Sequence, residues 1–296
     1  MHTSPRRNTA MQLTRTVLGL FKLRIGFVIM ITALAGFAVT PGAAASGMQL
    51  AVLALAVFIS SASAGAFNQY VELDVDRLMK RTRGRAFVTG QLPHTPAWLL
   101  LIVLLLSVSV FAAWRATNAL AAFYVFLGAF FYAVVYTVWL KRRTWLNIVV
   151  GGLAGSFSVL AGAAAANPEI GTLPLLLALV LFLWTPPHFW SLAIANQEDY
   201  AAAGIPMLPV VVGAARAAWV VFYSALALVG ASLLPAFFGS GPIYLAGASL
   251  GGGYFLLKAW QLARAPSRQT AMASFFASLM QLSLLLVVAM LDAWVY

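Results

Sequence analysis

Long apolar runs, separated by short polar stretches, are the main pattern along this chain. A helix needs about 20 predominantly apolar residues to cross a hydrocarbon core of roughly 30 Å. Nine runs approach that length, at Ile25–Val39, Leu50–Gln69, Ala97–Trp114, Leu120–Val138, Ile148–Ala165, Leu173–Ala195, Ala217–Phe238, Ile243–Trp260 and Met272–Trp294. The pattern predicts an all-α, polytopic integral membrane protein with about nine transmembrane helices. We expect one domain over residues 1–296, with residues 1–20 as a flexible cytoplasmic tail.

The distribution of basic residues predicts the orientation of these spans. Short cytoplasmic loops accumulate Lys and Arg, and with the N-terminus inside, 17 of the 18 basic residues fall on the cytoplasmic side. Only Arg115 falls outside, so we expect the N-terminus in the cytoplasm and the C-terminus on the outer side. We expect the protein in the cell (inner) membrane. The basic start and first apolar run also fit a cleaved signal peptide, although Lys22 and Arg24 at the span entrance favour retention.

Composition supports the membrane assignment and limits the possible partners. Hydrophobic residues make up 62% of the chain and charged residues 8%, whereas soluble domains have about 25% charged residues. The net charge of +11 lies mainly on the predicted cytoplasmic face, where it would attract anionic lipid headgroups and anionic substrates. We therefore expect the lipid bilayer as a partner and no nucleic acid. The chain has no cysteine, so a bound metal would need oxygen or nitrogen ligands.

Five of the seven acidic residues lie in two short clusters, which indicates a functional site. A carboxylate at the centre of a membrane-spanning helix costs on the order of 3 kcal/mol unless water, cations or substrate compensate. In the first cluster, Asn68, Glu72 and Asp76 are four residues apart and share one helix face, whereas Asp74 points elsewhere. The second cluster, Glu198 and Asp199, follows the sixth span and returns to the same membrane face.

Basic side chains accompany both acidic clusters. The set consists of Arg81, Arg83, Arg85, Lys141 and Arg142. Carboxylates and cations beside an apolar interior suit a diphosphate held through Mg²⁺, with a lipid tail entering the bundle. This combination favours a prenyl diphosphate as substrate. The clusters are also compatible with solvated loops, and the basic residues with positive-inside topology alone.

Several segments resemble a known enzyme family. Residues Asn68–Arg85 resemble the first motif of the UbiA superfamily of intramembrane prenyltransferases. Residues Tyr136–Gly152, Trp184–Trp190 and Asp199–Pro209 resemble its haem O synthase branch, the protohaem IX farnesyltransferases. The resemblance implies a nine-helix bundle around a lipid-open cavity. It also implies farnesyl transfer from farnesyl diphosphate to a vinyl group of haem b, giving haem O for haem-copper oxidases.

The resemblance also implies roles for individual residues. Asn68, Glu72, Asp76 and Asp199 would be the catalytic residues that hold Mg²⁺ and diphosphate, with Arg81, Arg85, Lys141 and Arg142 as diphosphate contacts. One departure concerns the second motif, where the superfamily commonly has a second Asp four residues on. Ala202 and Ala203 stand there, which puts a second metal shell in doubt.

Other roles and other functions remain open at the sequence level. His188 follows two prolines within an apolar span and is the candidate haem contact, although a structural hydrogen bond would explain it as well. Haem A synthase or oxidase-assembly proteins are candidate partners. The acidic clusters would also suit a prenyltransferase with a quinone precursor or chlorophyllide as acceptor. A cation-coupled transporter is a further alternative, and it predicts carboxylates at mid-depth.

Overall fold

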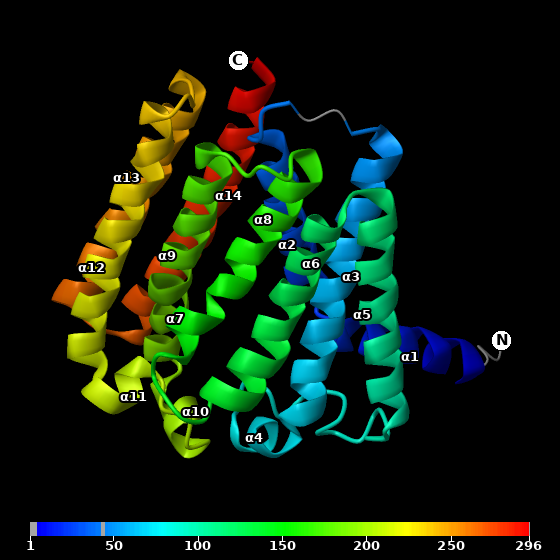
Figure 1. Cartoon of the computed structure of the whole chain (residues 1–296). Helices are drawn as coiled ribbons and strands as arrows, with labels where there is room; N and C mark the ends of the chain where they lie inside the picture. Colours follow the sequence, from blue (N-terminus) through cyan, green and yellow to red (C-terminus); the bar gives the residue numbers. More distant parts are fainter. Residues whose placement is uncertain (1–4, 43–44, 296) are drawn as a thin grey trace.

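The computed structural model describes residues 5–42 and 45–295, with side chains from residue 11, and every regular element in this part is a helix (Figure 1). The helices are α1 (Pro5–Leu20), α2 (Leu23–Ala38), α3 (Gly47–Val71), α4 (Leu73–Leu78), α5 (Ala97–Ala116), α6 (Ala119–Phe130), η1 (Phe131–Leu140), α7 (Asn147–Gly151), α8 (Leu153–Ala166), α9 (Thr172–Ala195), α10 (Gln197–Ala202), α11 (Leu208–Val212), α12 (Ala214–Leu233), η2 (Leu234–Phe237), α13 (Pro242–Arg264) and α14 (Arg268–Val295). The all-α prediction is confirmed.

Seven helical segments within the described residues are long and apolar enough to cross a membrane. They are α3, α5, α6 with η1, α7 with α8, α9, α12 with η2, and α14. Helices α1 and α2 form an eighth if this pair, bent by 48°, counts as one span. The predicted span Ile243–Trp260 corresponds to α13, whose glycines and Lys258 lower its mean hydropathy. The count of nine and the N-in, C-out orientation therefore stay predictions.

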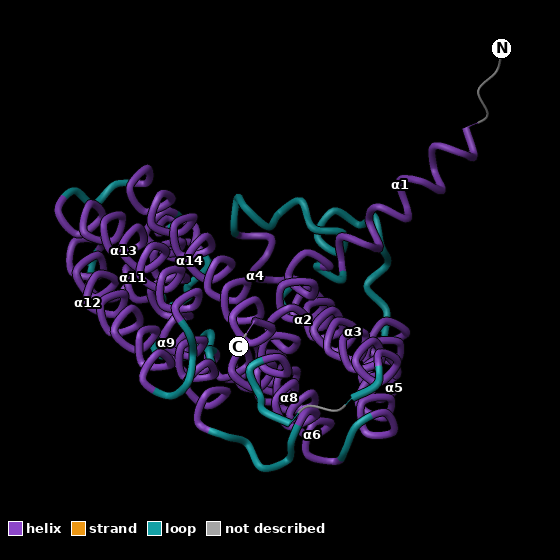
Figure 2. Tube along the Cα trace, turned by 90° about the horizontal axis from the view of Figure 1, so that it is seen from above, coloured by secondary structure: helices purple, strands orange, loops and turns teal. Residues whose placement is uncertain are grey.

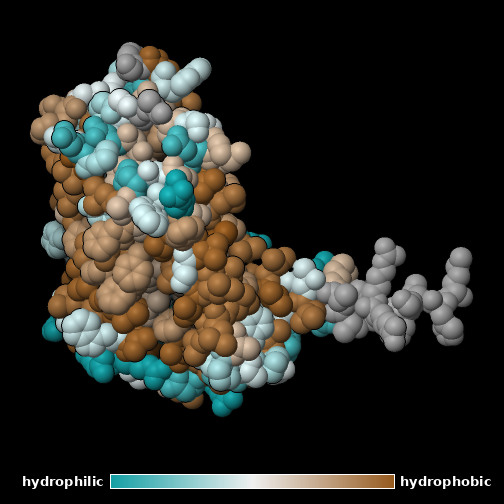
Figure 3. Space-filling view, turned by 45° about the vertical axis from the view of Figure 1, so that its right-hand side comes forward, coloured by the Kyte–Doolittle hydropathy of each residue, from teal (hydrophilic) through white to brown (hydrophobic). Residues whose placement is uncertain are grey.

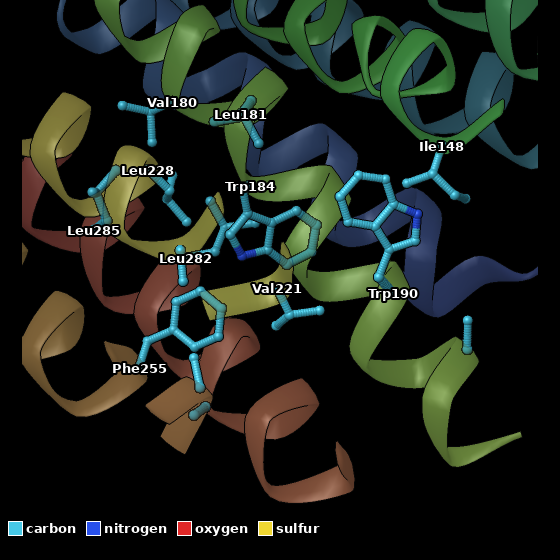
Figure 4. Packing of buried hydrophobic residues seen from close by; sticks show 14 of the residues in the cluster. Ile148, Val180, Leu181, Trp184, Trp190, Val221, Leu228, Phe255, Leu282 and Leu285 are labelled. Atoms are coloured by element: carbon cyan, nitrogen blue, oxygen red, sulfur yellow. The ribbon is translucent and has the colours of Figure 1, made fainter. Parts of the chain in front are cut away.

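The long helices form two packed groups, one with α9 and α12–α14 and one with α2, α3, α5, α6 and α8 (Figure 2). Helix α2 packs against α3, α8 and α14, and α9 packs against α8, α12 and α14. Helix α13 lies between α12 and α14, and α5 lies outside α3 and α6. The core of the half that contains α9 is filled by large side chains such as Trp184, Phe255 and Leu282 (Figure 4).

Small residues allow α2 and α8 to approach closely. A methyl group on Gly36 would overlap the carbonyl of Val159, and one on Gly162 would overlap the carbonyl of Ala33. Lipid tails are as apolar as leucine, so close backbone packing of this kind drives helix association in membranes. Gly36 and Gly162 therefore have a structural role at this helix contact.

Polar surface is concentrated at the ends of the bundle. On the face shown in Figure 3, apolar residues cover most of the side, and hydrophilic residues gather at the lower end and in patches near the upper end. The short helices α4 and α10 lie at the lower end in Figure 1. Helix α1, Pro5–Leu20, projects from the body of the bundle toward this end. The flexibility expected for residues 1–20 stays a prediction.

Asp292 is a buried acidic residue that belongs to neither acidic cluster. Asp292 of α14 accepts hydrogen bonds from the backbone N–H groups of Gly241 (2.6 Å) and Tyr244 (3.1 Å). Gly241 precedes α13 and Tyr244 lies in its first turn, where helix hydrogen bonding is incomplete and negative charge is favourable. Asp292 therefore caps α13.

Candidate active site

The junction of α3 and α4 presents the first acidic cluster on one face, as predicted. The backbone N–H of Glu72 donates to the carbonyl of Asn68 (3.2 Å), and that of Asp76 donates to the carbonyl of Glu72 (2.8 Å). The four-residue hydrogen-bond spacing thus continues through the break between the helices. Asn68, Glu72 and Asp76 are all buried. The fully solvated loop considered for these residues is therefore wrong.

Each member of this face is paired with a basic side chain. Lys141 Nζ donates to Glu72 Oε1, and Arg85 Nη1 donates to Asp76 Oδ2 at 2.6 Å. Arg85 Nη1 also lies 4.0 Å from Glu72 Oε2, so the two carboxylates share this guanidinium. Buried charges are tolerated only when they are paired and hydrogen-bonded, and these pairs meet that condition. We call Glu72, Asp76, Arg85 and Lys141 the inner pocket.

A π-helix positions Lys141 for this contact. Residues Phe131–Leu140 form η1, and the N–H of Lys141 donates to the carbonyl of Tyr136 five residues earlier (2.9 Å). π-Helical turns are rare and are often found at functional sites. Thr137, in the same segment, accepts a hydrogen bond from Asn68 Nδ2 (3.2 Å). The π-helix and the lysine that follows it therefore contact Asn68 and Glu72 of the first acidic face.

Arg142 points away from the inner pocket to Asp74. Its guanidinium donates two hydrogen bonds of 2.8 Å to the two oxygens of that carboxylate. Both side chains are exposed, by 44% for Arg142 and 64% for Asp74. The structure thus confirms that Asp74 faces elsewhere. It does not bring Arg142 to the inner pocket with Lys141, and its role as a diphosphate contact stays a prediction.

Burial and pairing act in opposite directions on the charges of the inner pocket. Burial raises the pKa of Asp76, and the Arg85 guanidinium offsets part of that rise. Burial lowers the pKa of Lys141, and the Glu72 carboxylate offsets part of that decrease. Desolvation alone would favour the neutral forms of Asp76 and Lys141, and the ion-pair partner of each one favours its charged form. Removing the charge of one partner would therefore shift the pKa of the other.

The second acidic cluster contacts Arg81, in the loop that follows α4. The backbone N–H of Arg81 donates to Asp199 Oδ2 (3.2 Å), and Arg81 Nη2 donates to the hydroxyl of Tyr200 (3.4 Å). Glu198 is exposed. The structure therefore places Asp199 at the rim, against the loop after α4, and not beside Glu72 and Asp76.

The oxygen atoms of this region are of the type that binds a hard cation, but they are not arranged as a preformed metal site. Carboxylate and amide oxygens are what Mg²⁺ prefers, and Asn68, Glu72 and Asp76 supply them. Among the described residues, no three His, Asp or Glu side chains are grouped closely enough to hold a metal ion. Lys141 and Arg85 contact the carboxylate oxygens that would serve as ligands, and Lys22 contacts Asn68 Oδ1. Metal binding would therefore require these basic groups to move aside.

His188 is packed tightly in the middle of α9. Its ring stacks between Trp184 (centroids 4.1 Å apart) and Phe275 (4.4 Å). Its Nδ1 lies 2.7 Å from the Ser278 hydroxyl, which donates to the carbonyl of Phe275. Since that hydroxyl hydrogen is used, Nδ1 carries the proton and Nε2 is the acceptor. The structural hydrogen bond considered for His188 is present, and the haem contact stays a prediction.

Lys22 was interpreted from the sequence only as a topology signal. Its ammonium donates to Asn68 Oδ1 at 2.7 Å and to the Tyr132 hydroxyl at 3.3 Å. No sequence motif distinguishes it from Arg24, which is exposed. Only its position just before the first span could have suggested that it reaches inward.

Comparison with known proteins identifies the family. Residues 29–285 match the UbiA prenyltransferase family. Protoheme IX farnesyltransferase 2 of Paramagnetospirillum magneticum is 55% identical over 94% of this chain and 96% of its own length.

Solved structures share the fold at lower identity. A structure of digeranylgeranylglyceryl phosphate synthase has a TM-score of 0.78 and 17% identity, covering 96% of this chain and all of that one. A UbiA homologue from Archaeoglobus fulgidus, bound to DMAPP and Mg²⁺, has a TM-score of 0.73 and 16% identity, covering 91% and 99%. With the apolar helices, these relatives make this a multi-pass membrane protein. The chain belongs to the UbiA prenyltransferase family.

Proposed function

We propose that this protein transfers a farnesyl group from farnesyl diphosphate to a vinyl group of haem b, giving haem O and diphosphate. The observation that carries the proposal is the inner pocket, where two buried carboxylates and two basic side chains meet at one end of an apolar bundle. The 55% identity to a protoheme IX farnesyltransferase over nearly the whole chain supports haem b as the acceptor.

The reaction needs charge stabilisation more than a protein nucleophile. The C–O bond of farnesyl diphosphate breaks and its electron pair leaves with the diphosphate, so negative charge grows on the leaving group. Preorganised cations stabilise such charge strongly where water is excluded. Lys141 and Arg85 are placed to donate to the diphosphate oxygens once they leave their carboxylate partners.

The carboxylate and amide oxygens would then hold a divalent cation. Asn68, Glu72 and Asp76 would supply the ligands, with Asp199 as a further ligand at the rim. When bound, Mg²⁺ supplies Lewis-acid neutralisation of the diphosphate. The Mg²⁺ bound in the Archaeoglobus fulgidus homologue supports this assignment. Arg81, whose backbone contacts Asp199, would contact the diphosphate from the rim.

Haem b would react through its vinyl group. The vinyl electrons form a new carbon–carbon bond to C1 of the farnesyl cation, and water captures the cation left on the porphyrin side with loss of a proton. We place the haem beside α9, where His188 Nε2 has its acceptor lone pair. The product is a hydroxyethylfarnesyl arm.

The cellular setting follows from charge. We place the inner pocket at the cytoplasmic face of the cell membrane, since the predicted topology puts 17 of the 18 Lys and Arg residues on that side. Haem A synthase and oxidase-assembly proteins remain candidate partners. The transporter alternative is disfavoured, because the paired carboxylates lie at one end of the bundle and not at mid-depth.

The decisive test is an assay of the purified protein with haem b, farnesyl diphosphate and Mg²⁺. We expect haem O by mass spectrometry. A quinone precursor and chlorophyllide should be offered in parallel as acceptors. Prenylation of either one, with no haem O formed, would contradict the proposed acceptor.

A further inference from the structure

We propose that Lys22 is a third cation of the diphosphate site and positions the prenyl substrate together with Lys141 and Arg85. This inference rests on the proposed function, since it concerns how the same substrate is held. It assigns Lys22 a role beyond membrane topology. The backbone conformation of Lys22, its contacts with α3 and η1, and the charges around it support this role.

The backbone at Lys22 is held in an unusual conformation. Lys22 joins α1 to α2 with φ 48° and ψ 45°, and it is the only residue other than glycine with positive φ in the described chain. The left-handed region is unfavourable for residues with a side chain and persists where surrounding contacts impose it. Such conformations are concentrated at functional sites. A glycine would meet the backbone requirement more easily, so the lysine side chain itself needs an explanation.

Helix α3 holds the turn that carries Lys22. The side-chain amide of Gln69 donates to the carbonyls of Gly19 (3.2 Å) and Leu20 (2.9 Å). A Cβ on Gly65 would lie 3.4 Å from Cβ and Cδ of Lys22, so the lysine stem lies against α3 at that residue. The side chain is therefore directed along α3 toward Asn68, one residue before Gln69.

The ammonium of Lys22 ends beside the inner pocket. It donates to Asn68 Oδ1 at 2.7 Å and to the Tyr132 hydroxyl at 3.3 Å. Burial disfavours the charged form of this ammonium most strongly, Arg85 and Lys141 also oppose its charge, and Glu72 and Asp76 favour it. An ammonium has three donors, and these two contacts use two of them.

The charge balance favours an anionic ligand. With Lys22 protonated, the three basic side chains contribute three positive charges, and Glu72 and Asp76 contribute two negative ones, so an anionic ligand would stabilise the protonated form of Lys22. Lys141 and Arg85 have carboxylate partners, whereas Lys22 donates only to neutral oxygens in its two side-chain contacts. A cation in this position is available to an added anion at little cost in existing ion pairs. A diphosphate next to Asn68 would supply that anion.

Binding of a non-reacting substrate analogue tests the role without requiring turnover. Farnesyl thiodiphosphate should be titrated calorimetrically into purified protein in detergent with Mg²⁺. We expect Lys22→Met and Lys22→Gln each to raise Kd at least about tenfold, because a charge-assisted hydrogen bond is lost, and Lys22→Arg to stay within about threefold of wild type. Arg24→Met is the matched control. It removes an exposed charge two residues away and should change Kd by less than about twofold.

Melting temperatures separate binding from folding. If Lys22→Met or Lys22→Gln melts within the range of Arg24→Met and binds the analogue as tightly as wild type, the inference is overturned. It is also overturned if Lys22→Arg loses as much affinity as Lys22→Gln, since positive charge would then not be the reason. Failure of the wild-type protein to bind farnesyl thiodiphosphate would instead contradict the proposed function.

Discussion

Asp74 and Asp76 are two residues apart on the same short helix and have opposite surroundings. The Asp76 side chain is 2% exposed and paired with Arg85, whereas the Asp74 side chain is 64% exposed and paired with Arg142. Their basic partners also differ, since Arg85 is mostly buried and Arg142 is largely in solvent. The two pairs have similar chemistry, so the comparison isolates the effect of burial.

Burial determines what such a pair can do. An exposed ion pair contributes about 0–1 kcal/mol, because water screens it and two flexible side chains must be ordered. Breaking a buried pair costs about 3–5 kcal/mol, because the remaining charge has no solvent. A substrate diphosphate or a divalent cation would therefore perturb the inner pocket strongly and the Asp74–Arg142 pair only weakly. We expect catalytic function to depend on the inner pocket.

The largest expected effect is the difference in catalytic rate between the Asp76→Asn and Asp74→Asn variants. Asp76→Asn should lower the rate of haem O formation by at least about 100-fold, because a charge needed for cation binding at the leaving group is lost. Asp74→Asn should stay within about threefold of wild type. Both rates should be measured in membranes with matched protein levels and insertion. Wild-type activity in Asp76→Asn would remove Asp76 from the site.

The adjacent residues Lys141 and Arg142 give the second test. Lys141→Met should reduce kcat/KM for farnesyl diphosphate about 10- to 100-fold, because it removes a buried donor facing the leaving group. Arg142→Met removes the same charge one residue later and should cost less than about threefold. An equal loss of kcat/KM in the two variants would contradict the assignment of Lys141, and not Arg142, as the cation that contacts the substrate.

Stability should differ between the same two variants. Lys141→Met leaves the Glu72 carboxylate buried with only the more distant Arg85, and should lower the free energy of unfolding by about 3 kcal/mol. Arg142→Met should lower it by less than about 1 kcal/mol. Denaturant unfolding in mixed micelles would measure both. Adding Glu72→Gln to Lys141→Met should recover part of the loss, and no recovery would mean that the destabilisation has another cause.

The smallest expected effect concerns acid titration of the exposed pair. Hydrogen bonds from Arg142 hold the pKa of the Asp74 carboxyl below its usual value. The contribution of this pair to stability is therefore present above the unfolded-state pKa of about 3.9 and is lost as pH falls through the lower folded-state value. Asp74→Asn should change stability by under about 1 kcal/mol at pH 7 and by less near pH 3. A larger difference at pH 3 than at pH 7 would contradict the sign.

Spacing in the sequence was sufficient to predict the first acidic face and much of the helix pattern. Asn68, Glu72 and Asp76 are four residues apart, and α-helical geometry alone places them together. The prediction that Asp74 points elsewhere followed from the same geometry.

Distinguishing Lys141 from Arg142, or Lys22 from Arg24, was beyond sequence reasoning. Neighbouring basic residues in a cytoplasmic loop carry the same topology signal. The π-helical turn before Lys141 and the left-handed conformation at Lys22 decide which side chain turns inward. Both depend on tertiary contacts, including the Gln69 hydrogen bonds to the turn before Lys22.

The most direct test of the inner pocket is a crystal structure of the protein with Mn²⁺ and farnesyl thiodiphosphate. Anomalous scattering would locate the metal independently of the side chains. We expect a peak at coordination distance from Glu72 and Asp76, with Lys141 and Arg85 moved from these carboxylates onto the diphosphate. A peak elsewhere, with both ion pairs intact and the diphosphate bound away from them, would contradict the account.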